Sequence, residues 1–269
     1  MHYDPIKKTL GRFFSGSPFM RKSFYFLLDT LLLRTWHVKR ALRRITAGFK
    51  SEVNILDAGC GFGQYTWQMS RMNSLWNVKA VDIDSEHVSD CSSFFVKAGL
   101  SDRVTFQTLD LTNLSENKCY DLILSVDVME HIEEDEKVFE NFFSSLRDNG
   151  TLIVSTPSDK GGSDVHNEND DSFIGEHVRD GYSKNDITEK LTRTGFSKVK
   201  VSYTYGIPGT ISWRLSMKYP IKMLNISYLF FLIIPFWYLI FLPVSLLLNY
   251  LDLIISHKEG TGLLVIAQK

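Results

Sequence analysis

The sequence is poor in cysteine and has no cysteine pair at the spacing of a metal site. Cys60, Cys91 and Cys119 lie too far apart for a CxxC motif, so neither a zinc site nor a dithiol redox site is expected. The apolar run Phe24–Leu33 is interrupted by Asp29 and lacks a small-residue cleavage site, which argues against a secretory signal. These absences predict a cytoplasmic protein without a metal ion.

Charge is nearly balanced over the whole chain but unevenly distributed. The net charge is −1, whereas residues 1–50 contain eleven Lys or Arg and only two acidic residues. Within residues 34–44, five cations alternate with apolar side chains, which predicts a basic amphipathic helix suited to an anionic membrane. A solvated helix face is the alternative. No stacking platform or binding motif accompanies the cations, so a nucleic-acid partner is not expected.

Short apolar segments alternate with helical patterns along most of the chain. The expected strands are 53–57, 78–82, 104–109, 120–125, 151–155, 198–203 and 262–267. This alternation predicts βαβ units and a mostly parallel sheet. We therefore expect an α/β fold with a Rossmann-like seven-stranded sheet and helices on both faces. Its expected parts are an N-terminal helical cap over residues 1–50, a core over 51–205, a helical insertion over 206–258 and a last strand within 259–269.

A glycine-rich turn follows the first expected strand. Residues 57–63 have the sequence DAGCGFG and open a helix, and glycine there permits a tight turn and close approach of a ligand. Dinucleotide-binding turns instead use G-x-G-x-x-G, which seats a pyrophosphate on the helix N-terminus. The carboxylate of Asp57 would repel a pyrophosphate but would suit a ligand with a cationic amino group.

The ordered motifs of this chain resemble those of the class I S-adenosylmethionine-dependent methyltransferases. Asp82 matches the acidic residue that binds the ribose hydroxyls, Ile83 the apolar residue against adenine, and Asp110 the acid that receives the adenine amino group. The resemblance covers residues 51–205 and the final strand, and it implies S-adenosylmethionine as the cofactor. The cofactor-binding residues that we expect are Asp57, Gly59, Gly61, Gly63, Asp82, Ile83, Asp110, Leu111 and Ser125.

Two histidines are candidates for a catalytic base. Methyl transfer to oxygen requires positioning and removal of a proton. His131 follows the fourth strand, where the resemblance places the sulfonium, and a histidine can accept a proton near neutral pH. Residues 176–182 resemble a segment that borders the substrate in small-molecule methyltransferases, which makes His177 the second candidate. The alternative for both is a structural histidine that caps a helix or bonds a loop to the core.

The segment Met223–Leu251 contains no charged residue. Its length and composition are typical of a membrane helix, but the resemblance implies that the chain leaves and re-enters the sheet at the same edge. Pro235 and Pro243 should break or kink a helix. We therefore expect a helical hairpin that enters one leaflet, beside the carboxyl edge where ligands bind. A soluble lid or a dimer interface is the alternative.

These features together predict O-methylation of a hydrophobic lipid-, quinone- or polyketide-like molecule by a peripheral or monotopic protein on the cytoplasmic face of a membrane. The exit Thr156-Pro157-Ser158 differs from the Asn/Asp-Pro-Pro-Tyr/Phe signature of amino-methylating nucleic-acid enzymes. N-methylation of a lipid amine or another small molecule stays open, as does a membrane-tethered cofactor-binding protein without turnover. A nucleotide-dependent dehydrogenase is disfavoured by the glycine spacing. The sequence identifies neither the acceptor nor the oligomeric state.

Overall fold

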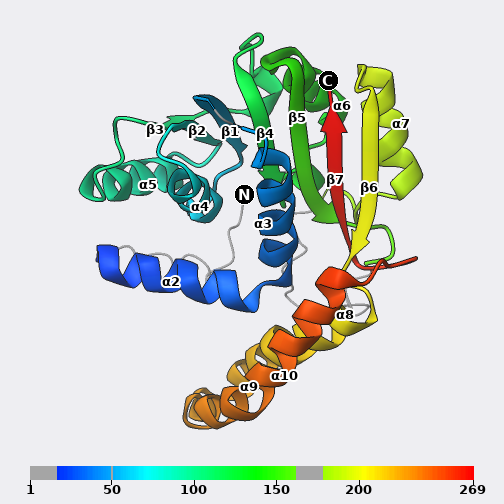
Figure 1. Cartoon of the computed structure of the whole chain (residues 1–269). Coiled ribbons are helices and arrows are strands. Elements are labelled where there is room, and N and C mark those ends of the chain that lie inside the picture. The colour runs from blue at the N-terminus through cyan, green and yellow to red at the C-terminus, as the bar shows by residue number, and fades with distance from the viewer. Residues whose placement is uncertain (1–16, 50, 162–177) are drawn as a thin grey trace.

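The computed structural model describes residues 17–49, 51–161 and 178–269. Its strands form one seven-stranded sheet in the order β3-β2-β1-β4-β5-β7-β6, which Figure 1 shows from one face. The strands are β1 (Val53–Ala58), β2 (Trp76–Asp82), β3 (Val104–Thr108), β4 (Tyr120–Val126), β5 (Leu146–Pro157), β6 (Lys198–Thr204) and β7 (Gly262–Gln268). β7 runs antiparallel to β5 and β6, and the other neighbours are parallel. The predicted mostly parallel sheet is confirmed.

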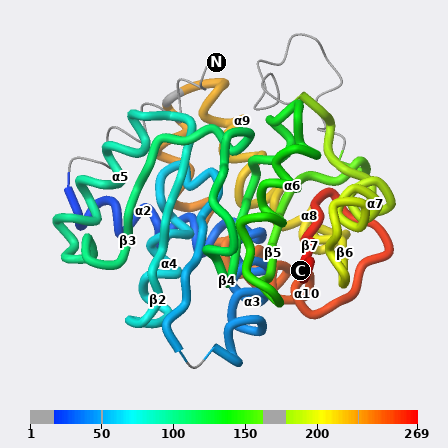
Figure 2. The backbone as a smooth tube through the Cα atoms, turned by 90° about the horizontal axis from the view of Figure 1, so that it is seen from above, coloured from blue at the N-terminus to red at the C-terminus, as the bar shows by residue number. Residues whose placement is uncertain are grey.

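Helices cover both faces of this sheet, so its central strands are apolar on both sides. Ile55 and Leu56 are neighbours on β1; Ile55 packs toward α3, α4 and α5, and Leu56 packs toward α6 and α7. The helices are α2 (Pro18–Leu31), α3 (Leu33–Thr46), α4 (Gln64–Met72), α5 (Ser85–Lys97), α6 (Asp135–Ser145) and α7 (Lys184–Thr194). Seen from above, α7 and β6 lie at the opposite end of the molecule from α5 and β3 (Figure 2).

The N-terminal cap consists of two helices where the sequence predicted one amphipathic region. The chain is extended at Leu32 (φ −86°, ψ 110°), which ends α2 and starts α3. Most cations of α3 make internal contacts: Lys39 Nζ lies 2.6 Å from Asp29, and Arg40 donates to the Leu253 carbonyl. These side chains hold the cap to the rest of the chain, whereas Arg43 and Arg44 of the same helix are exposed.

The insertion between β6 and β7 is a helical hairpin that projects beyond the carboxyl edge of the sheet (Figure 1). Its outgoing arm is α8 (Ile207–Trp213), the π-helical turn η3 (Arg214–Lys218) and α9 (Tyr219–Ile226), and its returning arm is α10 (Ile234–Ile254). The prolines, which were expected to break or kink a helix, do not break α10. Pro235 lies in the first turn of α10, where its missing N–H costs nothing, and α10 continues through Pro243 to Ile254.

Small residues let the two arms of the hairpin approach closely. The Ser212 hydroxyl donates to the Ser245 carbonyl at 3.0 Å, and the Tyr238 hydroxyl donates to the Ser216 carbonyl at 2.7 Å. The Trp237 indole points into the same contact and donates to the Leu215 carbonyl at 2.9 Å. Because polar groups are used between the arms, the exposed side chains of α10 are mainly apolar.

Asp252 holds the returning arm against the body of the protein. Its carboxylate is fully buried, and it lies 2.9 Å from His37 Nε2 and 3.1 Å from His257 Nε2. It also accepts hydrogen bonds from the backbone N–H groups of Tyr205 at 3.2 Å and Gly209 at 3.0 Å. One side chain therefore joins α3, both ends of the insertion and the start of α8.

Removal of the Asp252 carboxylate should destabilise the whole fold. Asp252→Ala leaves two histidines and two backbone N–H groups without their acceptor, and a buried donor left without its partner costs about 1–3 kcal/mol. Urea unfolding followed by circular dichroism should show a loss of this size. The control Asp148→Ala removes an exposed acid paired with Lys118 and should change stability by less than about 1 kcal/mol. Equal losses in both variants would contradict the role of Asp252.

Candidate active site

The glycine turn after β1 is shaped by close packing on one side and open space on the other. A Cβ at Gly59 would lie 2.2 Å from Val128 Cγ2, whereas a Cβ at Gly61 would meet no atom within 4 Å. Both residues have positive φ, 83° and 49°, which favours glycine. The turn is therefore pressed against the segment after β4 and leaves room above Gly61 for a ligand.

The end of β2 supplies a carboxylate and an apolar side chain beside this turn. Asp82 Oδ2 accepts from the Gly61 N–H at 2.7 Å, and Asp82 Oδ1 accepts from the Asp84 N–H at 3.0 Å. Ile83, the next residue, is 55% exposed despite its apolar side chain. An acceptor next to an exposed aliphatic group fits a ribose next to an adenine ring, as the resemblance implies.

Asp57 lies beneath the turn and is almost completely buried. Burial raises its pKa to about 7, although the Thr66 hydroxyl, which donates to Asp57 Oδ2 at 2.5 Å, acts in the opposite direction. The Asp82 carboxylate adds to the rise. A buried carboxylate of this kind gains from a nearby positive charge, and S-adenosylmethionine carries one on its sulfonium and one on its amino group.

The remaining expected cofactor residues differ in what their side chains do. Asp110 Oδ1 accepts from the N–H and hydroxyl of Thr112 at 2.9 and 2.8 Å, so its carboxylate shapes the turn after β3. The Leu111 side chain packs in the hydrophobic core, which leaves its backbone for any ligand contact. Ser125 is buried near the end of β4, and its hydroxyl has no hydrogen-bond partner among the described residues.

Helix α2 contacts the glycine turn, which the sequence did not indicate. The Tyr25 hydroxyl donates to the Phe62 carbonyl at 2.5 Å, and Arg21 Nη2 donates to the same carbonyl at 2.9 Å. Arg21 is buried and also lies 2.6 Å from Asp90 of α5. The N-terminal cap thus fixes the turn from outside, and the only available sequence signal was a cation at helical spacing from a tyrosine.

The segment after β4 holds the candidate base. Glu130 and His131 belong to the short helix η2 (Met129–His131). Glu130 is buried, accepts from the Thr156 hydroxyl at 3.0 Å, and has a raised pKa because of its burial, while the His131 charge acts in the opposite direction. His131 is partly exposed at the carboxyl edge. His177, the second candidate, lies outside the described residues, as does His166.

An ion pair between Arg34 and Asp127 crosses from the N-terminal cap to the segment after β4. Both side chains are about one third exposed, and the Arg34 backbone N–H donates to the Tyr205 hydroxyl at 3.0 Å. The cap, the β4 exit and the start of the insertion therefore meet at one point beside Val128 and the glycine turn. No group of three metal-binding side chains occurs within residues 17–49, 51–161 and 178–269.

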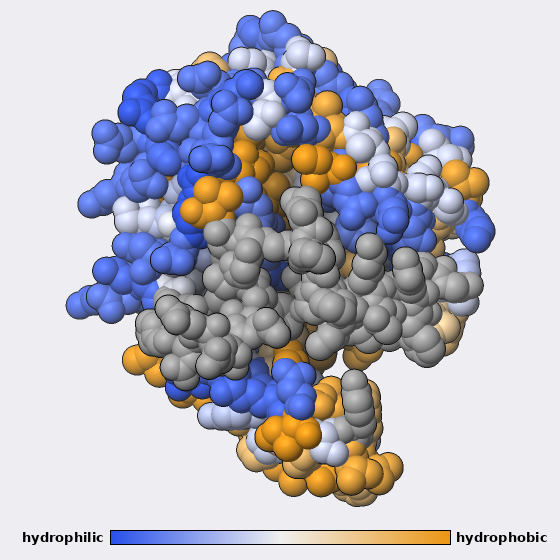
Figure 3. Space-filling model, turned by 180° about the vertical axis from the view of Figure 1, so that it is seen from behind, coloured by the Kyte–Doolittle hydropathy of each residue, from blue (hydrophilic) through white to orange (hydrophobic). Residues whose placement is uncertain are grey.

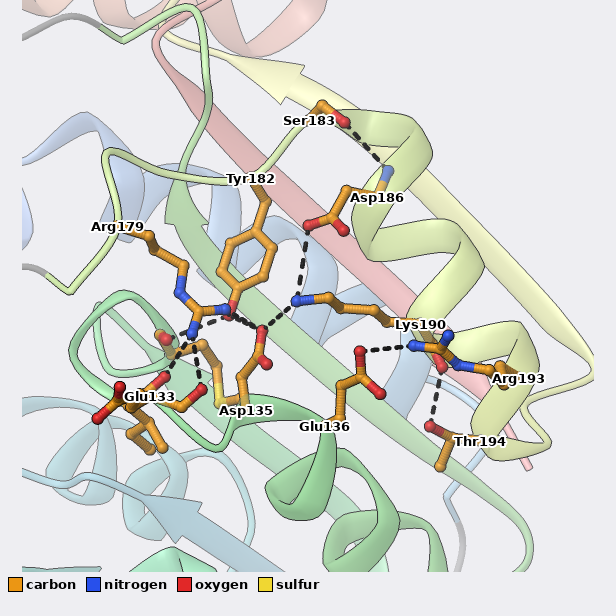
Figure 4. A network of polar contacts seen from close by, with 12 residues as sticks. Glu133, Asp135, Glu136, Arg179, Tyr182, Ser183, Asp186, Lys190, Arg193 and Thr194 are labelled. Carbon is orange, nitrogen blue, oxygen red and sulfur yellow. Dashed lines mark hydrogen bonds and ion pairs between the residues drawn. The ribbon is translucent and has the colours of Figure 1, made fainter.

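A second polar network fixes the chain after residue 177 to the body (Figure 4). The buried Asp135 pairs with Arg179 and lies 2.8 Å from Lys190 Nζ and 2.7 Å from the Tyr182 hydroxyl. Arg179 also donates to the Ile132 carbonyl at 2.7 Å. Burial alone would raise the pKa of Asp135. The hydrogen bonds from Lys190 and Tyr182 have the larger effect, so the pKa of Asp135 is lowered. The network holds residues 178–182 against the segment that carries the candidate base.

The geometry defines a cofactor-binding α/β protein of the class I methyltransferase type, and comparison with known proteins supports this. A family model described as a methyltransferase domain matches residues 49–201, more than half of the chain. The chain belongs to this family, the class I S-adenosylmethionine-dependent methyltransferases, and S-adenosylmethionine is its cofactor. The open cradle above Gly61, with Asp82 and Ile83 beside it, fits that cofactor.

Individual relatives are more distant. The chain is 26% identical over 117 residues to the ubiquinone biosynthesis O-methyltransferases of Rickettsia canadensis and Rickettsia felis, which covers 43% of this chain and 48% and 46% of those proteins. It therefore spans about half the length of these curated relatives. The fold is similar to that of phosphoethanolamine N-methyltransferase 2 from Haemonchus contortus, with a TM-score of 0.64, 17% identity and coverage of 99% of this chain and 60% of that one.

Cofactor binding should depend on the charge of Asp57. With a pKa of about 7, this carboxyl is mostly protonated at pH 6 and mostly ionised at pH 8, so affinity for the cationic cofactor should rise by about tenfold between these values. The cofactor-free fold should show the opposite trend, because a raised pKa means that stability is lost as pH rises through 7. Calorimetric titration at both pH values measures the first effect.

Asp57→Asn is the matched control for that titration. The amide keeps the shape of the side chain but cannot ionise, so its affinity should change less with pH than that of the wild type. The amino group of the cofactor titrates equally in both experiments and cancels in the comparison. Identical pH profiles for the two proteins would remove Asp57 from the binding of the cationic ligand.

Proposed function

We propose that this chain transfers a methyl group from S-adenosylmethionine to a hydroxyl of a hydrophobic lipid-, quinone- or polyketide-like molecule at the cytoplasmic surface of a membrane. The observation that carries the proposal is the position of the apolar hairpin, which starts and ends at the edge of the sheet that bears the cofactor turn. The O-methyltransferase names of the Rickettsia relatives favour oxygen as the acceptor atom.

The cofactor supplies the methyl group on a sulfonium, and the protein positions the two reactants. Asp82 binds the ribose hydroxyls, Ile83 lies against adenine, and Asp57 favours the positive charge of the ligand from beneath the turn. The acceptor enters between the β4 exit and the start of the insertion, where Arg34 and Asp127 pair. Because alignment contributes most of the rate in such displacements, the rigid connections around this point matter more than any single acid or base.

His131 removes the acceptor proton in this proposal. It lies at the carboxyl edge directly after the buried Glu130, and a histidine can accept a proton near neutral pH. Thr156 fixes Glu130 by its hydrogen bond. A general base of this kind contributes about 10²–10⁴-fold to the rate.

The surface of the hairpin supports the membrane part of the proposal. Leu229, Leu232 and Phe236 near its tip are 75%, 74% and 68% exposed, and Figure 3 shows the projection at the bottom of the molecule as mostly hydrophobic beneath a largely hydrophilic body. Among the described residues, α10 is the one helix that is long and apolar enough to cross a membrane by length and composition. Its return to β7 favours shallow insertion.

Methyl transfer can be tested without knowledge of the acceptor. Purified protein, S-adenosylmethionine with a labelled methyl group and a membrane lipid extract should yield labelled product in the lipid phase and S-adenosylhomocysteine. His131→Ala should lower this rate by about 10²-fold with unchanged cofactor affinity, whereas Asp82→Ala should weaken cofactor binding by about tenfold or more. If the wild type binds S-adenosylmethionine but releases no S-adenosylhomocysteine, the result would favour a binding protein without turnover.

The tip of the hairpin should govern membrane association. Replacing Leu229, Leu232 and Phe236 with Ser removes side chains that each contribute about 1.5–3 kcal/mol when buried, so vesicle affinity should fall more than a hundredfold. Trp237 is left intact because it packs between the arms.

The control for the tip variant is Leu75→Ser with Val96→Ser, two exposed apolar residues on the body. It should bind vesicles like the wild type. Cofactor affinity should be unchanged in both variants, because the cofactor turn lies in the sheet. If the wild type does not float with vesicles, the hairpin is instead a soluble lid or an interface between copies of the chain.

A further inference from the structure

Helix α2 has a buried inner side and an exposed outer side. Arg21 and Tyr25 are four residues apart, so they share one side of the helix, and both are buried. Phe19 and Phe26 are two turns apart, so they share another side, and they are 78% and 69% exposed, with the exposed Leu27 beside them. A helix of a soluble protein normally buries its apolar side, whereas α2 buries an arginine and a tyrosine and exposes two phenylalanines.

The inner side of α2 holds the glycine turn. The Tyr25 hydroxyl and Arg21 Nη2 both donate to the Phe62 carbonyl, at 2.5 and 2.9 Å, and Phe62 lies between Gly61 and Gly63 in the sequence. Arg21 Nε also donates to the Tyr25 hydroxyl at 2.7 Å, so the two side chains act together. Because this carbonyl belongs to the turn, the position of α2 and the shape of the turn depend on one another.

The outer side of α2 points in the direction of the hairpin. The Tyr25 ring centre lies 5.9 Å from that of Phe94 of α5 and 6.2 Å from that of Trp67 of α4, so the inner side faces these two helices. Figure 1 shows α4 and α5 above α2, and the hairpin projecting below it. The two exposed phenylalanines are therefore on the side of the molecule from which the hairpin projects.

A lipid surface fits this side better than a second copy of the chain. Lys22 of α2 and Arg43 and Arg44 of α3 are exposed. Asp29 is the one acid of these two helices, and it pairs with Lys39. In a symmetric dimer the same surface occurs on both copies, so two basic caps would face one another. Anionic lipids attract a basic surface, and phenylalanine with lysine is typical of a helix that binds a membrane surface.

We propose that the outer side of α2 is a second membrane contact, beside the hairpin, and that contact with lipid strengthens the binding of S-adenosylmethionine. The proposal rests on the membrane location proposed above. A bilayer that holds Phe19 and Phe26 keeps α2 on the Phe62 carbonyl, so the glycine turn is ordered before the cofactor arrives. A protein that one ligand has ordered binds a second ligand more tightly. The cofactor must then strengthen lipid binding by the same factor.

Contact of α2 with lipid is tested by a probe on its outer side. An environment-sensitive fluorophore is attached at Leu27→Cys in the full chain, in a Cys119→Ser background because Cys60 and Cys91 are buried. Its emission should shift to the blue with vesicles of phosphatidylcholine and phosphatidylglycerol. The same probe at Val96→Cys, an exposed position on α5, is the control and should not shift. In protein that floats with vesicles, no shift at residue 27 or an equal shift at residue 96 would overturn the contact.

The effect on the cofactor is tested by calorimetric titration of S-adenosylmethionine with and without the same vesicles, at a lipid concentration that binds all of the protein. The affinity of the wild type should rise by about fivefold or more on vesicles, which is the usual size of coupling between two sites. The variant Phe19→Ser with Phe26→Ser should keep the vesicle-free affinity of the wild type. It should still float at high lipid, because its hairpin is intact, and it should lose the rise.

The matched control Leu75→Ser with Val96→Ser removes two exposed apolar residues elsewhere and should keep the rise. A rise that survives in the α2 variant, or that the control loses equally, overturns the assignment to α2. If the wild type floats with vesicles and its cofactor affinity does not change, only this inference is overturned. Failure of the wild type to float removes the membrane location as well.

Sedimentation without vesicles tests the alternative occupant of the outer side. Both the wild type and the variant Phe19→Ser with Phe26→Ser should have the same oligomeric state. A wild-type dimer that this variant converts to a monomer would assign the outer side of α2 to contact between copies and would overturn the lipid contact.

Discussion

The antiparallel strand β7 determines where the hairpin can stand. Thr204, the last residue of β6, is opposite Gly262, the first residue of β7, and Gly262 is also opposite Pro157 at the end of β5. The chain between these strands must leave and return at the carboxyl edge of the sheet, which is where the glycine turn opens. An apolar segment inserted at this connection is therefore placed beside the reaction site, and it cannot cross a bilayer once and still complete the sheet.

The same edge is where the N-terminal cap is attached, so three parts of the chain share one set of contacts. Arg34 pairs with Asp127 after β4 and its backbone bonds to Tyr205, while His37 one turn further bonds to Asp252 of the hairpin. Displacement of the hairpin would therefore strain the cap and the β4 exit together. This coupling links the position of the hairpin to that of the β4 exit.

The local sequence pattern predicted the strands, helix ends and turns that interactions between neighbouring residues determine. The strands were expected to within a few residues, apart from the longer β5, because apolar runs between polar turns suffice to identify them. Asp84 and Ser183 cap α5 and α7, and Gly195 ends α7 in a left-handed conformation, as helix-end signals predict. The glycine turn was likewise predictable, because a tight turn is encoded in consecutive residues.

Long-range pairing could not be predicted in this way. The single helix expected over the N-terminal region is two, because Leu32 is extended where tertiary contacts require a corner. Helix α10 continues through Pro243, where a break or a kink was predicted, because the packing of α10 against α8 offsets one missing hydrogen bond. Arg21 donates to the Phe62 carbonyl, and His37 bonds to Asp252. The residues in each pair are far apart in the sequence, so no periodic pattern predicts the contact.

The cations of α3 show that charge pattern alone does not identify the partner of a cation. A cation at helical spacing looks the same whether its partner is a carboxylate of the same chain or a lipid phosphate. Lys39 and Arg34 have acids within reach, Asp29 and Asp127, which lie in other turns of the fold. Pairing across the fold satisfies the charge of such side chains internally, so the spacing of cations in the sequence does not by itself distinguish a membrane-facing surface from a set of tertiary ion pairs.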